Sequence, residues 1–277
     1  MLGKLFRNEI KGTWKTILTI YAITIVTSIT GSLFFEFNGN ELGKVGSIIG
    51  TSLTVAYIFS IIGLFLATFI YICSRFYKTM YSDQGYLTHT LPVSPLAHLN
   101  VKLITAFMWL FLAGVIFIIS VIIILLQSLG GDLWEILFTN DLWNNLNRIT
   151  QESLGYDFLP VAGILLLMVV VGCLNILCTV FSSFSIGQLF NQHKIGAAIG
   201  VGIGFYFLEQ MIMLMILIRW VEDVYNEVTM VVGDVTVTYT DPSAFRIVWP
   251  IIIAFTAFAV VQYVITAVIV KKRLNLD

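Results

Sequence analysis

The chain has 277 residues, of which 58% are hydrophobic and 11% are charged, and its net charge at pH 7 is −1. A soluble domain carries about 25% charged residues, so this composition excludes an ordinary water-soluble protein and indicates a membrane protein. The near-zero net charge offers no general attraction to nucleic acid, and we expect no nucleic-acid partner.

The first 15 residues mix apolar and basic side chains at helical spacing. The apolar residues are Leu2, Leu5, Phe6, Ile10 and Trp14, and the basic residues between them are Lys4, Arg7, Lys11 and Lys15. Such a segment is typical of an interfacial helix that lies flat in the lipid headgroup region. The alternative is a basic flank that only orients the first membrane span.

Six long, almost uncharged stretches follow. A membrane-spanning helix needs about 20 mostly apolar residues, and nearly all the stretches reach that length. The predicted helices cover residues 17–36, 46–74, 103–128, 158–187, 195–218 and 247–270. The sequence therefore predicts an all-α integral membrane protein with one transmembrane domain over residues 1–277.

Basic residues gather on one side of these helices. If the N-terminus is cytoplasmic, 11 of the 15 Lys and Arg residues fall in inside segments and 4 fall outside. Cytoplasmic loops of membrane proteins carry such an excess of positive charge. We therefore predict a multi-pass protein of a bacterial plasma membrane with both termini in the cytoplasm.

Three polar segments connect the predicted spans. In the cytoplasmic segment 75–102, Ser94 followed by Pro95 predicts a helix N-cap and a first-turn proline. In the outer segment 132–157, Asp132 and Glu135 predict the start of a short surface helix. In the outer segment 219–246, the turn signal at residues 233–234 predicts a small β-hairpin.

Small residues recur in the fifth predicted span. Gly196, Gly200 and Gly204 form a tandem G-x-x-x-G pattern. Because small residues let helix backbones approach closely, the pattern predicts a helix-packing face. Whether the partner helix belongs to this chain or to another subunit stays open.

Glu209 is the one acid inside a predicted span, and Gln210 follows it. An intramembrane carboxylate is costly and usually faces a cavity or a partner, so both residues are candidates for a substrate path. Asn175 and Gln262 are further candidates in other spans. Two alternatives stay open: the span ends early and leaves Glu209 at the outer interface, or the neutral residues merely bond neighbouring helices.

The chain lacks the residue patterns of membrane enzymes and of ATPases. Its three histidines, His89, His98 and His193, all lie in predicted loops, and it contains neither G-x-S-x-G nor the phosphate-binding pattern G-x-x-x-x-G-K-[ST]. We expect that the chain is not an enzyme and holds no metal or cofactor of its own. Any ATP that drives it would be bound by another chain.

The order of these elements resembles that of the type-2 ATP-binding-cassette (ABC) exporter permeases. In that family an N-terminal interfacial helix precedes six spans, a coupling helix between helices 2 and 3 docks on the ATPase, and a polar segment between helices 5 and 6 lies outside. Residues 1–15, 75–102 and 219–246 are the counterparts here. The sequence RFYKTMYSDQGYLTHTLPVS is the most specific part, whereas the predicted hairpin departs from the short helices that the family often has.

The resemblance implies the permease subunit of an ATP-driven exporter. Its partners would be ABC ATPase subunits that hold ATP and magnesium, a second permease copy or a related permease, and membrane lipid. The ATPase-coupling residues would be Tyr81, Asp83, Gly85, Tyr86, Leu87 and Leu91. The apolar, charge-poor spans favour an amphipathic substrate such as a peptide, an antibiotic or a lipid. The alternative is a secondary transporter or channel, which would need charged residues in several spans.

Overall fold

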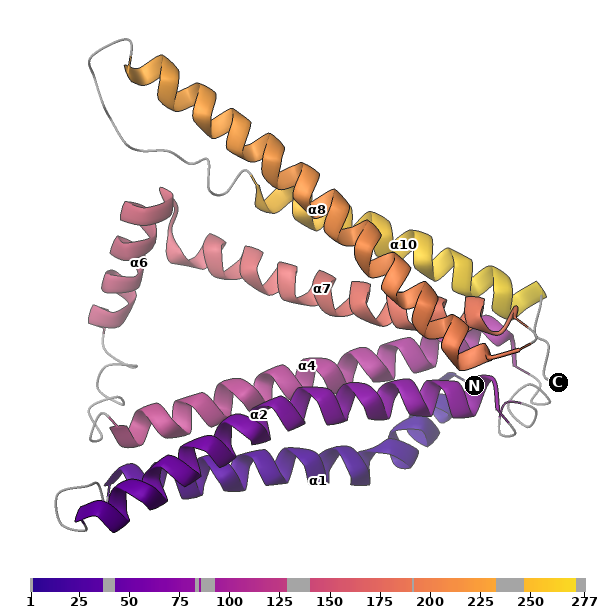
Figure 1. The fold of residues 1–277 in the computed structure, drawn as a ribbon, viewed down its shortest axis with the longest axis horizontal. Coiled ribbons are helices and arrows are strands. Elements are labelled where there is room, and N and C mark those ends of the chain that lie inside the picture. Colours follow the sequence, from indigo (N-terminus) through magenta and orange to yellow (C-terminus); the bar gives the residue numbers. More distant parts are fainter. Residues whose placement is uncertain are drawn as a thin grey trace. The chain divides into compact units, whose positions relative to one another are not determined.

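Helices make up most of the described chain. The computed structural model describes residues 2–36, 43–82, 85, 93–128, 140–190, 192–232 and 247–272. Within them lie α1 (Leu2–Glu36), α2 (Gly43–Met80), α4 (Pro95–Ser128), α6 (Asn140–Leu154), α7 (Phe158–Gly187), α8 (Lys194–Val232) and α10 (Val248–Lys272), and no strand (Figure 1). Six of these helices, all except α6, are long and apolar enough to cross a membrane. The prediction of an all-helical, multi-pass membrane protein is confirmed at this level.

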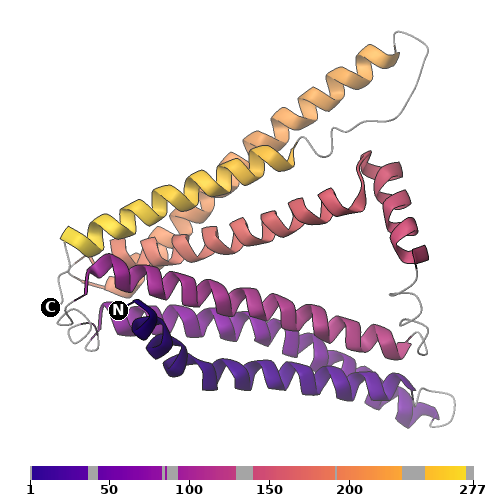
Figure 2. The ribbon, with the colours of Figure 1, turned by 180° about the vertical axis from the view of Figure 1, so that it is seen from behind.

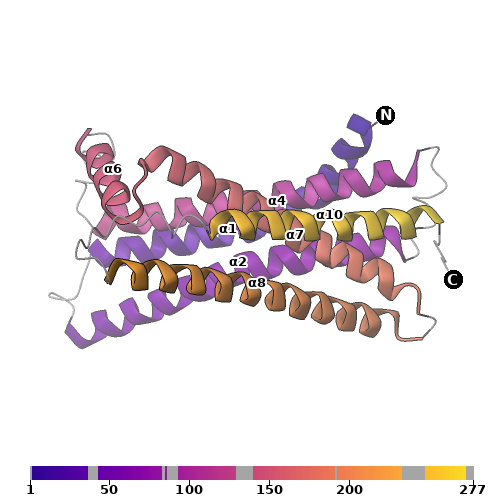
Figure 3. The same cartoon turned by 90° about the horizontal axis from the view of Figure 1, so that it is seen from above.

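The helices group into two compact units. The first contains α1, α2 and α4, and the second contains α6, α7, α8 and α10. In the first unit α1 packs against both α2 and α4. In the second unit α7 packs against α8 and α10, and α6 adjoins α7 (Figure 3). The sequence predicts one transmembrane domain, and the helices within it divide into these two units.

Several helices extend beyond the apolar stretches that predict them. The bounds of α7 agree with the prediction, but α2 continues to Met80, α4 begins at Pro95 and α8 runs to Val232. Apolar composition marks the part of a helix that lies in hydrocarbon, whereas backbone hydrogen bonds continue the helix through polar residues beyond it. Ser94 caps α4 as predicted, because the Ala97 amide donates to its Oγ at 3.3 Å.

The predicted interfacial segment and the first predicted span form one continuous helix, α1. Figure 2 shows the first turns of α1 at an angle to the rest of the helix. In α1 the Thr13 hydroxyl donates to the carbonyl oxygen of Glu9 at 2.9 Å. Back-bonding of this kind bends helices, and the neighbouring Gly12 adds no side chain to resist it.

The outer segments are described in part. α6 lies within the segment 132–157, where the sequence predicts a short helix, although the predicted start at Asp132 and Glu135 lies outside the described residues. The predicted hairpin turn at residues 233–234 also lies outside them. Residues 228–232, which precede that turn, belong to α8.

The buried face of α1 is rich in small hydroxyl residues. Thr13, Ile17, Tyr21, Thr24, Ser28 and Ser32 are buried and recur every three or four positions. The hydroxyls of Thr24, Ser28 and Ser32 each donate to a carbonyl three or four residues earlier in α1, which satisfies them within the helix. Because these side chains are small, α2 and α4 can approach α1 closely.

Candidate functional site

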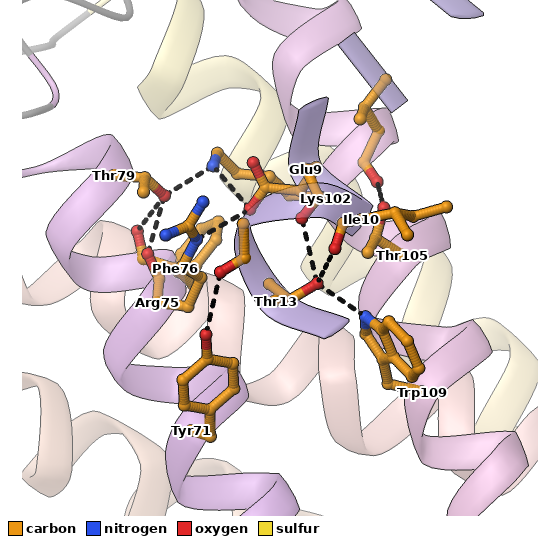
Figure 4. A network of polar contacts seen from close by, with 12 residues as sticks. Glu9, Ile10, Thr13, Tyr71, Arg75, Phe76, Thr79, Lys102, Thr105 and Trp109 are labelled. Atoms are coloured by element: carbon orange, nitrogen blue, oxygen red, sulfur yellow. Dashed lines mark hydrogen bonds and ion pairs between the residues drawn. The ribbon is translucent and has the colours of Figure 1, made fainter. Parts of the chain in front are cut away.

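A network of charged side chains joins the three helices of the first unit (Figure 4). Glu9 of α1 accepts from Arg75 Nε of α2 at 3.3 Å and from Lys102 Nζ of α4 at 3.5 Å. The same carboxylate oxygen, Oε1, receives both contacts. One carboxylate therefore holds two cations that come from two other helices.

The network is largely withdrawn from solvent. The side chain of Lys102 is 7% exposed and that of Glu9 is 16% exposed. Lys102 Nζ also donates to Thr79 Oγ1 at 2.5 Å, and Thr79 Oγ1 donates to the carbonyl oxygen of Arg75 at 2.7 Å. A second hydrogen-bonded link thus connects α2 and α4 beside the ion pairs. A buried ammonium group needs such partners, because an unpaired charge at this depth is costly.

Further contacts hold the first turns of α1 to the same two helices. The guanidinium group of Arg75 lies against Gly12, where a Cβ atom would collide with its Nη2. Tyr71 of α2 donates to the carbonyl oxygen of Gly12 at 3.2 Å. Trp109 of α4 donates from Nε1 to Thr13 Oγ1 at 3.0 Å (Figure 4). The start of α1 is therefore bound on both sides.

This charged network borders the polar segment that the sequence singles out. Arg75 and Lys102 are the first and last residues of the segment 75–102, so both of its ends are anchored to Glu9. The ring of Tyr81, just after α2, lies edge-on to that of Phe76 at 5.8 Å. Gly85 lies so close to the Met80 carbonyl that a Cβ atom would come within 2.6 Å of its oxygen. Four other candidates for ATPase coupling, Asp83, Tyr86, Leu87 and Leu91, lie outside the described residues.

The sequence analysis did not identify Glu9, Arg75 or Lys102 as part of a site. A signal was present, because Glu9 is the only acid among the basic residues of the first 15 positions. Its partners lie 66 and 93 residues away, and only the packing of α1 between α2 and α4 brings them together.

A second polar cluster lies in the other unit and contains two of the predicted substrate-path residues. Thr179 of α7 donates toward Glu209 Oε1 of α8 at 3.1 Å and toward Gln262 Oε1 of α10 at 3.0 Å. Gln262 Nε2 donates to Glu209 Oε1 at 3.2 Å. The side chain of Gln262 is fully buried. Each of the three helices thus contributes one side chain to this cluster, and Thr179 is a member that the sequence analysis missed.

The remaining predicted residues of α7 and α8 occupy different places. Asn175 is buried one turn before Thr179 on α7, and its backbone carbonyl oxygen lies 2.9 Å from Thr179 Oγ1. Gln210 is exposed to a groove between α8 and α10. Within this unit α8 approaches α7 through Ala198 and Gly202, and Gly187 of α7 lies against Ala198.

The predicted glycine stripe lies on a different face of α8. Gly196, Gly200 and Gly204 are all exposed, and a Cβ atom at Gly200 or Gly204 would meet no atom within 4 Å. Positions 198 and 200 are about 200° apart around a helix, which places the stripe away from α7. In the described part of its unit, the stripe therefore makes no close helix contact.

Comparisons with models of protein families, with curated proteins and with solved structures find no match to this chain.

Proposed function

We propose that the chain is the membrane-spanning permease subunit of an ATP-driven ABC exporter that moves an amphipathic substrate out of a bacterial cell. It would sit in the plasma membrane with both termini in the cytoplasm and work with a second permease. Separate ATPase subunits would bind ATP and magnesium. The proposal extends the family resemblance of the sequence.

The observation that carries the proposal is the charged network around Glu9. A permease of this kind must pass a movement of its ATPase from a cytoplasmic segment to its membrane helices. The segment 75–102 is suited to that task, because both of its ends are tied to α1 through one partly buried carboxylate. A displacement of the segment would be passed to three helices together, since interlocked polar contacts resist independent motion of any one of them.

Residues within the segment fit the same role. Tyr81 continues directly from α2 with its amide donating to the Tyr77 carbonyl at 2.9 Å, so it extends the helix end. Gly85 closes a tight turn, with its amide donating to the Ser82 carbonyl at 2.6 Å. We assign ATPase contact to the aromatic and apolar side chains beyond this turn, because buried aromatic anchors dominate the binding energy of protein interfaces.

The test is co-expression of the chain with a candidate ABC ATPase, sought first among the genes beside its own, followed by mass measurement of the complex purified in detergent. We expect two permease chains and two ATPase chains. Recovery of the chain without any ATPase, under conditions in which both are expressed, would contradict the proposal.

The cluster around Glu209 favours a second candidate function, that of a secondary transporter without an ATPase. Proton- and ion-coupled transporters place carboxylates among polar residues inside the membrane. In the predicted spans of the second unit, residues 158–187, 195–218 and 247–270, however, Glu209 is the only acid. Transport into liposomes that depends on an ion gradient and not on ATP would favour this candidate.

A further inference from the structure

Two side chains, Thr179 and Gln262, supply the hydrogen-bond donors of the cluster around Glu209. The single hydroxyl hydrogen of Thr179 faces three acceptors: Glu209 Oε1, Gln262 Oε1 and the Asn175 carbonyl oxygen. It can satisfy only one of them fully, since a hydroxyl carries one proton. Gln262 Nε2 supplies a further donor to Glu209. The two side-chain acceptors are satisfied together only if Thr179 donates to Gln262 Oε1 and Gln262 Nε2 donates to Glu209 Oε1, which leaves one hydrogen bond to that carboxylate oxygen within the cluster.

Asn175 adds another acceptor beside the cluster. It lies one turn from Thr179 on α7, and residues four apart share a helix face. It is 2% exposed, and its Oδ1 atom has no hydrogen-bond partner in the described structure. A buried acceptor without a donor costs about 1–3 kcal/mol, so the free protein retains a polar group here at the expense of its stability.

Glu209 also has no cation beside it in the described part of its unit. On the described parts of α7, α8 and α10, the basic residues all lie outside the predicted spans, at Lys194, Arg219, Lys271 and Lys272. Along α8, Lys194 and Arg219 are about 22 and 15 Å from Glu209, at a rise of about 1.5 Å per residue. Acids within membrane spans normally pair with a cation or face a polar cavity.

An apolar groove begins at the level of Glu209. It lies between α8 and α10, has a volume of about 420 Å³, and is lined by residues that include Phe207, Gln210, Met211 and Leu214. Phe207 and Gln210 flank Glu209 in the sequence of α8, so one end of the groove lies at the same height along the helix as Glu209. Pockets of about 300–1,000 Å³ hold small molecules, and methionine side chains adapt to apolar ligands of varied shape.

We infer that Glu209, Thr179, Gln262 and Asn175 form a recognition site for a primary ammonium group, and that the substrate is a cationic amphipathic molecule. The ammonium group supplies a positive charge beside Glu209 and an N–H donor for Asn175 Oδ1, which has none in the described structure. The apolar part of the same molecule lies in the groove between α8 and α10. That this molecule is a transported substrate rests on the proposed function, whereas ammonium binding does not.

The experiment measures binding of octylammonium to the purified full chain in a neutral detergent, from the shift of its thermal unfolding midpoint with probe concentration. Octanol is the uncharged control, and octyltrimethylammonium carries the charge without N–H donors. We expect octylammonium to bind most tightly of the three. Glu209→Gln should weaken octylammonium binding by about thirtyfold or more, because it removes one partner of a desolvated charge pair.

Two variants control for general effects on folding. Glu222→Gln makes the same chemical change on α8 at an exposed acid that pairs with Arg219, and it should leave binding unchanged. Asn175→Leu should raise the unfolding midpoint of the free chain, because it removes a buried acceptor without a donor, and yet weaken octylammonium binding. These opposite signs would not arise if Asn175 had only a structural role.

Three results would overturn the inference. Octanol could bind as tightly as octylammonium, sodium chloride could compete fully at millimolar concentration, or Glu209→Gln could bind octylammonium like the wild type. The exporter proposal is tested separately by ATPase association. Glu209-dependent binding of octylammonium by a chain that associates with no ATPase would retain the ammonium site and remove the exporter.

Discussion

Glu9 joins three helices of the first unit, because one oxygen of its carboxylate contacts both Arg75 of α2 and Lys102 of α4. Arg75 and Lys102 both depend on it for their countercharge. In a buried group of this kind, the cost of removing one partner comes mainly from the charges left behind. Glu9 is therefore expected to be the member of this network that is most sensitive to substitution.

Replacement of Glu9 by Gln should destabilise the protein by about 3 kcal/mol or more. The substitution preserves size but leaves Lys102, which is 7% exposed, without a negative partner. The measurement is the free energy of unfolding in detergent from denaturant titration. Glu152→Gln, at an exposed acid of α6, is the matched control and should change little. Equal stability of the two variants would contradict the burial of this network.

The charged network around Glu9 could not be predicted from the sequence, and the reason is physical. A carboxylate among basic residues near the N-terminus looks like part of a solvated face, because nothing local distinguishes it. Arg75 and Lys102 likewise look like basic residues that only orient the spans. By contrast, Glu209 could be singled out, since an acid in the middle of an apolar stretch is unusual in itself.

At the scale of elements, small residues bring α7 and α8 of the second unit into close contact. Gly187 lies against Ala198, and Gly202 lies against Ser183 with 3.4 Å between its Cβ position and the Ser183 Oγ atom. These contacts lie on one face of α8, whereas the tandem glycines lie on another. The G-x-x-x-G pattern places small residues on one face of a helix, but the pattern alone does not show which face contacts a neighbouring helix.

Gly187→Ala should therefore destabilise the protein by about 1–3 kcal/mol, as overpacking does in other cores. Its Cβ atom would lie 2.7 Å from Ala198 Cβ and 2.8 Å from the Lys194 carbonyl oxygen, so the two helices would have to move apart. Gly200→Ala is the matched control, because its Cβ atom meets nothing within 4 Å. Thermal unfolding of both variants in detergent checks the difference. A larger loss at position 200 would show that the stripe, and not Gly187, makes the critical contact.

Helix existence could be predicted from composition much better than helix ends. The spans follow from long apolar runs, and α7 agrees to the residue. The other helices run into charged or polar sequence, where hydropathy falls although the backbone stays helical. The continuity of α1 could not be predicted in this way, because the change from basic to apolar composition at Lys15 looks like a boundary.

For the whole molecule, the prediction that remains to be tested is its orientation in the membrane. The excess of basic residues predicts that the segment 75–102 is cytoplasmic and the segment 219–246 is outside. Single cysteines at positions 83 and 234 can be labelled on intact cells with a membrane-impermeant thiol reagent, after replacement of Cys73, Cys173 and Cys178. We expect labelling at 234 and none at 83. The reverse pattern would invert the orientation.

The proposed coupling role makes a separate prediction for the assembled transporter. Alanine at both Tyr86 and Leu87 should weaken ATPase association by about 2 kcal/mol or more, or uncouple ATP hydrolysis from transport, because aromatic anchors dominate interface energies. Co-purification of the ATPase and substrate-stimulated hydrolysis are the measurements. Membrane insertion should be unchanged, and it serves as the control. Full retention of both activities would mean that this segment does not couple the subunits.

The hydrogen bonds described above also show when each polar group can gain its partner while the chain is being synthesised. The hydroxyl groups of Thr24, Ser28 and Ser32 on the buried face of α1 find their acceptors within α1, so these groups need no partner helix when α1 enters the bilayer. Glu209 differs, because its amide donor, Gln262, lies 53 residues later in the chain. At about 5–20 residues per second, the ribosome delivers Gln262 about 3–10 s after Glu209. During that interval Thr179 has already been made, and it is the donor from this cluster that is available to Glu209. The last helix, α10, then completes the site.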